Sequence, residues 1–68
     1  MDNWQPVYED EKRHRVEIVK AVLEDNHMNP VVLNQTISEH GLGTFEVRVA
    51  PDFVLAAIKI IKEDIKFE

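Results

Sequence analysis

The sequence predicts an α+β domain in which two amphipathic helices cover one face of a small antiparallel sheet. Three observations support this prediction. Two segments have apolar residues at helical spacing, and they alternate with short segments rich in β-branched and aromatic residues. Residues 44–49 alternate strictly between polar and apolar side chains, as a half-buried strand does. The chain has 68 residues without repeats or linkers, so a single domain spanning 1–68 is expected.

The first strand is expected at Trp4–Glu9, which is aromatic and β-branched. Pro6 lacks a backbone donor, so this strand is expected at an edge of the sheet. Strict alternation divides its side chains into two sets, with Trp4, Pro6 and Tyr8 on one face and Gln5, Val7 and Glu9 on the other. The sequence leaves open which set meets the helices.

The first helix is expected at Asp10–Asn26. Its core line consists of Val16, Val19 and Leu23, with Ile18 and Val22 beside them. Asp10 and Glu11 are expected in its first turn, where they complement the helix dipole. The helix is expected to end before Pro30, because a residue that precedes proline avoids helical geometry.

Two further strands and a second helix follow. The strands are expected at Val31–Leu33 and Thr44–Val49, and the second of these buries Phe45, Val47 and Val49. The second helix is expected at Asp52–Asp64. Its core line consists of Val54, Ile58 and Ile61, with Ala57 beside them. Ile65–Phe67 is either a fraying tail or a very short fourth strand.

The connections between these elements predict the strand order. A helix joins the first two strands, and a chain reversal joins the second to the third. In a ferredoxin-like split βαβ arrangement the third strand lies between the first two. We therefore expect a ferredoxin-like βαββα(β) two-layer sandwich, with both helices on one face and a fourth strand that is short or absent.

Composition narrows the class of function. The formal charge is −5, with thirteen acidic and eight basic residues, which disfavours binding to nucleic acid or to an anionic membrane. There is no cysteine, so disulfides and thiolate metal sites are excluded. Apolar runs fall short of the roughly 20 residues of a membrane span, so a soluble cytoplasmic protein is expected.

Three stretches of sequence carry a likeness to a known family. They are WQPVYE at 4–9, VEIVKAVLEDNHMNPVVLN at 16–34 and GLGTFEVRVAPDFVLAAIKIIKE at 41–63. They extend from residue 4 to residue 63, and the chain resembles the DUF2007 family of prokaryotic signal-transducing proteins across nearly its full length. That resemblance implies a ferredoxin-like fold related to PII-type (GlnB-like) regulators. It also implies a signalling or binding role, and it supplies no catalytic residue.

Motifs for catalysis or metal binding are missing from the sequence. The three histidines lie thirteen residues apart, whereas metal ligands usually lie close together. They are His14, His27 and His40. The acidic run Glu9–Glu11 lacks the alternate spacing and the glycine of a calcium loop. The GLG at 41–43 lacks the lysine of a phosphate loop and precedes a strand. We therefore expect a protein that is not an enzyme and has no cofactor.

The stretch Asn34–Thr44 connects the second strand to the start of the third and has eleven residues, more than most hairpin loops contain. One interpretation, by analogy with PII regulators, is a loop that engages partners. Its contact residues would then be Gln35, Glu39, His40 and Leu42. The other interpretation is a connection without a binding role, which contains a helical turn at Thr36–His40 capped by Thr36 and Glu39.

Trp4 and Tyr8 have two interpretations as well. They either form an exposed interaction surface on the open face of the sheet or belong to the core. We expect a non-enzymatic regulatory or binding module that contacts a protein partner or a small ligand. The alternative is a homo-oligomeric domain that pairs through the exposed edge of the first strand or through the open sheet face.

Overall fold

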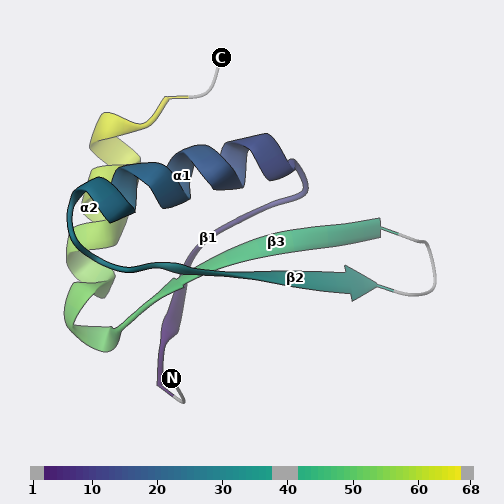
Figure 1. Cartoon of the computed structure of the whole chain (residues 1–68), viewed down its shortest axis with the longest axis horizontal. Helices are drawn as coiled ribbons and strands as arrows, with labels where there is room; N and C mark the ends of the chain where they lie inside the picture. Colours follow the sequence, from purple (N-terminus) through teal and green to yellow (C-terminus); the bar gives the residue numbers. More distant parts are fainter. Residues whose placement is uncertain (1–2, 38–41, 67–68) are drawn as a thin grey trace.

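The computed structural model describes residues 3–37 and 42–66. The chain forms strand β1 (Gln5–Asp10), helix α1 (Arg13–Asp25), strands β2 (Val31–Ile37) and β3 (Leu42–Val49), the short 3-10 helix η1 (Pro51–Phe53) and helix α2 (Val54–Asp64). Figure 1 shows the hairpin of β2 and β3 reaching away from α2, which lies at the opposite end of the molecule.

The sheet is antiparallel, and its strand order is β1-β3-β2. The third strand therefore lies between the first two, and β1 is an edge strand, as the sequence predicts. Strands β2 and β3 pair without interruption from Val31 opposite Arg48 to Ile37 opposite Leu42. The architecture is a three-stranded α+β arrangement compatible with a ferredoxin-like fold.

A β-bulge interrupts the pairing of β1 with β3. Pro6 lies opposite Arg48 and Tyr8 lies opposite Val47, which leaves Val7 as the extra residue. Val7 and Tyr8 both pack against the hydrophobic core as a result. The expected strict alternation along this strand is therefore wrong, because the extra residue at the bulge moves the side chains after it to the opposite face of the sheet.

One hydrophobic core lies between the helices and one face of the sheet. Its buried side chains are Val16, Val19 and Leu23 of α1, Met28 of the following turn, Val47 and Val49 of β3, and Ala57 of α2. Both helices thus share a core with the same face of β3. The predicted core line of the first helix and the predicted buried valines of the third strand are confirmed.

Helix α2 meets this core through Ala57, which is fully buried. Val54 and Ile61 are half-buried against it, as expected, and Ile60 joins them. Ile58 was expected in the core line, but its side chain is 44% exposed. The helix is turned so that its smallest core residue faces the sheet, which moves Ile58 to the flank.

Helix α1 begins later than expected, at Arg13, and its first turn contains no acidic residue. Asp10 instead ends β1, and its Oδ1 accepts a hydrogen bond from the Lys12 backbone N–H at 2.9 Å. The carboxylate therefore shapes the link between strand and helix rather than the first helical turn.

The end of α1 has the hydrogen bonds of a Schellman motif. The Met28 N–H donates to the Leu23 carbonyl at 3.1 Å, and the His27 N–H donates to the Glu24 carbonyl at 2.9 Å. His27 and Asn29 have positive φ values of 63° and 49°. The predicted end of the helix before Pro30 is confirmed.

The long loop between the second and third strands is not present as predicted. β2 extends to Ile37 and β3 begins at Leu42, so residues 38–41, which lie outside the described residues, separate them. Thr36 pairs with Gly43 as part of the ladder, so the expected helical turn cannot begin there. Ile65 is extended and packs against the core, but the described residues contain no fourth strand.

Candidate functional site

A groove of about 330 Å³ lies between α1 and the sheet. Val16, Val32 and Phe45 form its apolar lining. Its polar lining consists of Arg13, Glu17 and Lys20 from the helix and Asn34 from β2. We call this site the α1–β2 groove; its volume falls within the lower part of the range for small-molecule pockets.

Helix and strand periodicity bring these residues together. Arg13, Glu17 and Lys20 are spaced by four and three residues, so they form one row along α1 beside its buried stripe. Val32 and Asn34 are two residues apart on β2 and therefore point to the same face of the sheet. Asn34 lies directly opposite Phe45. The groove is the space that remains where the helix row overhangs the β2 side of the sheet.

The charges of the groove favour an anion. Arg13 Nε lies 3.9 Å from Glu17 Oε1, and the two side chains are 76% and 53% exposed, so this ion pair is weak. Lys20 is half-buried and has no ion-pair partner among the described residues. With two cations and one carboxylate, the groove has a local charge of +1 on a chain whose formal charge is −5.

A second polar cluster joins β1 to α1. The Tyr8 hydroxyl donates to Asp10 Oδ2 at 2.6 Å, and Arg15 Nη1 lies 3.7 Å from the same oxygen. Burial, followed by the bond to Asp10, raises the pKa of Tyr8 to about 12. The hydrogen bond from the Tyr8 hydroxyl is the largest cause that lowers the pKa of Asp10, and the hydrogen bond from the Lys12 N–H is the second. These groups are already engaged with one another, so we interpret the cluster as structural.

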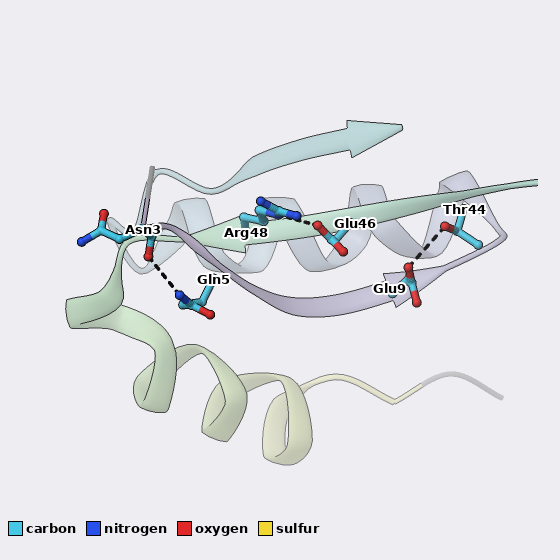
Figure 2. Close-up of polar contacts among 6 residues, drawn as sticks. All are labelled: Asn3, Gln5, Glu9, Thr44, Glu46 and Arg48. Atoms are coloured by element: carbon cyan, nitrogen blue, oxygen red, sulfur yellow. Dashed lines mark hydrogen bonds and ion pairs between the residues drawn. The ribbon is translucent and has the colours of Figure 1, made fainter. Parts of the chain in front are cut away.

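A third set of polar side chains lies on the open face of the sheet, which Figure 2 shows. Glu46 of the central strand is only 8% exposed, and its carboxylate accepts a hydrogen bond from Arg48 Nε. Glu9 lies directly opposite Glu46 and accepts a hydrogen bond from Thr44 Oγ1 at 3.3 Å. This part of the open face is polar and internally paired.

Two of the four residues that were expected to form a contact loop lie among the described residues. Gln35 is exposed on β2, directly opposite Thr44, and Leu42 begins β3 opposite Ile37. Both therefore belong to the sheet. Glu39 and His40 lie outside the described residues. A deletion across this stretch would remove strand pairs and would not test a free loop.

The two aromatic candidates of the N-terminal segment do not share one strand face. Trp4 precedes β1 and is half-buried. Tyr8 follows the bulge, lies opposite Val47 and packs against the core. Its hydroxyl is engaged by Asp10.

Sequence reasoning did not find the α1–β2 groove. Charged residues at helical spacing beside the apolar stripe of α1 indicate a solvent-exposed flank. The groove was not predicted, because β2 was expected to end at Leu33 and Asn34 was expected in a loop. Among residues 3–37 and 42–66, no three histidine, aspartate or glutamate side chains gather closely enough to hold a metal ion. In the same residues, no helix has the length and apolar character needed to cross a membrane.

No family model, curated protein or solved structure matches the chain. The resemblance to the DUF2007 family therefore stays a prediction.

Proposed function

We propose that this protein is a non-enzymatic regulatory or binding module that takes up a small anionic ligand with an apolar part in the α1–β2 groove. The observation that carries the proposal is the half-buried Lys20 beside an apolar floor in a chain whose formal charge is −5. A cation in such a place attracts anions toward one site of a protein whose net charge repels them.

The groove supplies complementary contacts for both parts of such a ligand. The Lys20 ammonium and the Asn34 amide are donors for a carboxylate or another anionic group. Val16, Val32 and Phe45 offer apolar surface for the remainder of the ligand. Glu17, which also lines the groove, disfavours ligands with several negative charges. A monoanion with a ring or a short aliphatic chain fits this set of groups best.

The lining of the groove supports binding rather than catalysis. Among the described residues, the lining contains no serine, threonine, cysteine, histidine or tyrosine, so it offers a bound molecule none of the usual hydroxyl, thiol or imidazole nucleophiles and bases. Lys20 and Glu17 are separated by less than one helical turn and lie on a solvent-facing row. These groups can bind and orient a ligand without breaking its bonds.

Sodium benzoate is a suitable probe, because it combines one carboxylate with a flat apolar ring. An exposed groove and a ligand of this size imply a dissociation constant on the order of 1 mM. We expect benzoate to shift the backbone amide resonances of Val32, Asn34 and Phe45 in a saturable way. Benzylammonium, which has a similar ring and the opposite charge, is expected to shift them much less.

Matched lysine variants test the role of the cation. We expect Lys20→Gln to weaken benzoate binding at least fivefold, whereas Lys59→Gln on the exposed surface of α2 leaves it unchanged. Non-saturable shifts, shifts spread over the whole chain, or equal effects of the two variants would contradict the proposal. The amide spectra of both variants report whether the fold is retained.

A further inference from the structure

The outer edge of β2 lacks the features that usually keep a sheet edge from pairing. β2 has β3 on one side and no strand on the other among the described residues. Its sequence, VVLNQTI, contains no charged residue and no proline. Its register with β3 is regular throughout, without a bulge. An uncharged edge strand without a proline or a bulge is a template for pairing with another strand.

The other edge of the same sheet differs in each of these respects. β1 contains Pro6, a bulge at Val7, and the carboxylates of Glu9 and Asp10. Helix α2 contacts β1, and Figure 2 shows α2 on the β1 side of the sheet with β2 on the opposite side. Proline, bulges and charges are the usual protections of an edge. β1 is therefore the better protected of the two edges of this sheet.

We propose that the β2 edge pairs with the β2 edge of a second copy of this chain, antiparallel across a twofold axis. The two three-stranded sheets then form one continuous sheet of six strands. This interface goes beyond the ligand site of the proposed function and does not depend on it.

The charge distribution identifies a second copy as the occupant. Two copies with a formal charge of −5 repel each other over most of their surfaces. At the β2 edge this repulsion is weakest, because an uncharged strand meets an uncharged strand. The same symmetric pairing at β1 would bring Glu9 and Asp10 of both copies together. A twofold interface must be complementary to itself, and β2 meets that requirement.

Pairing at β2 also makes use of side chains that the monomer covers only in part. Val31 and Leu33 are half-buried and lie opposite Arg48 and Glu46 on the open face. A neighbouring β2 strand extends this face and covers more of both side chains. For a chain of 68 residues, whose own core is small, such added burial is a significant source of stability.

Sedimentation equilibrium of the full chain tests the proposal with two matched variants. Gln35 on β2 and Gln5 on β1 are both exposed, so Gln35→Lys and Gln5→Lys place the same charge on opposite edges. We expect the wild-type protein and Gln5→Lys to shift toward twice the 7.9 kDa monomer mass as concentration rises. Gln35→Lys is expected to weaken this association at least tenfold, because it places a positive charge on the pairing edge of both copies.

A mixed-charge experiment separates edge repulsion from loss of fold. An equimolar mixture of Gln35→Lys and Gln35→Glu is expected to form a heterodimer, whereas each variant alone stays largely monomeric. A wild-type protein that is monomeric at millimolar concentration would overturn the proposal, as would association that responds to Gln5→Lys rather than to Gln35→Lys. Mixing that restores no dimer, with both variants folded by their amide spectra, would overturn it too. Because Lys20→Gln is not at the strand edge, loss of benzoate binding in that variant is a separate result from loss of the dimer.

Discussion

The hydroxyl of Tyr8 donates a 2.6 Å hydrogen bond to Oδ2 of Asp10, two residues further along the same strand. The other carboxylate oxygen of Asp10 accepts from the Lys12 backbone N–H, and Arg15 lies 3.7 Å from Oδ2. One carboxylate thus ends β1, fixes the turn that follows it and attracts the first helix. The bulge at Val7 makes this possible, because it sets the face on which Tyr8 lies.

The first prediction concerns stability in acid. The Tyr8 hydroxyl is the main cause that holds the pKa of Asp10 below its ordinary value of 3.8. Because the folded pKa is the lower one, the stabilisation is fully present above pH 3.8 and is lost as the pH falls through the folded pKa. We expect Tyr8→Phe to move the Asp10 pKa up toward 3.8, as measured by carbon NMR of the carboxyl group. An unchanged Asp10 pKa would contradict this account.

The second prediction concerns stability in base. Tyr8 is the one tyrosine of the chain, so its ionisation can be followed directly by ultraviolet absorbance. Its pKa is raised from 10.0 to about 12, so the stabilisation it provides is present below pH 10 and is lost as the pH rises toward 12. We expect Asp10→Asn to lower this pKa only in part, because burial is the larger cause. A return to 10.0 in that variant would show that burial contributes little.

The third prediction concerns the open face of the sheet. Arg48 donates a hydrogen bond to the nearly buried Glu46. Glu9 lies directly opposite Glu46 and carries the same negative charge. We expect Arg48→Gln to lower the free energy of unfolding by about 1 kcal/mol, since the pair is partly exposed and solvent weakens it. Adding Glu46→Gln is expected to recover part of that loss. Arg13→Gln, at an exposed ion pair, is the control and should cost less than about 0.5 kcal/mol in urea denaturation.

The fourth prediction concerns the end of α1. His27 has a left-handed backbone with φ of 63°, a conformation that disfavours residues with a Cβ atom. We expect His27→Gly to raise the free energy of unfolding by about 0.5–1 kcal/mol, because glycine removes this strain at some cost in chain entropy. Asn29→Gly is expected to gain less, since asparagine tolerates the left-handed region. Thermal denaturation of the two variants distinguishes them, and equal gains would contradict the explanation.

The fifth prediction concerns the docking of α2. Ala57 is fully buried, whereas its neighbour Ala56 is exposed. We expect Ala57→Leu to destabilise the fold by about 1–3 kcal/mol, because a larger side chain forces the helix away from the sheet. Ala56→Leu should change stability by less than about 0.5 kcal/mol. Similar stabilities of the two variants in urea would show that α2 is rotated differently.

Local patterns were sufficient for the strand order, the core line of α1 and the buried face of β3. The helical crossover, the chain reversal and Pro6 all agree with the order β1-β3-β2 of a ferredoxin-like split βαβ arrangement. These features depend on residues that are close in sequence, and each points to the same arrangement.

Features that depend on distant pairing were not predictable in the same way. Asn34 is a weak strand former on its own, and the ladder that pairs residues 34–36 with Gly43, Thr44 and Phe45 holds this stretch extended. The bulge at Val7 depends on the register of β1 against β3. The α1–β2 groove and the unprotected edge both require the full length of β2, so the sequence alone did not reveal them.

The binding proposal is tested most directly by intermolecular nuclear Overhauser effects between benzoate and the protein. A ligand seated in the α1–β2 groove is expected to give contacts from its ring protons to the methyl groups of Val16 and Val32 and to the ring of Phe45. Contacts to other parts of the chain, with none to these three side chains at saturating benzoate, would contradict the proposed site.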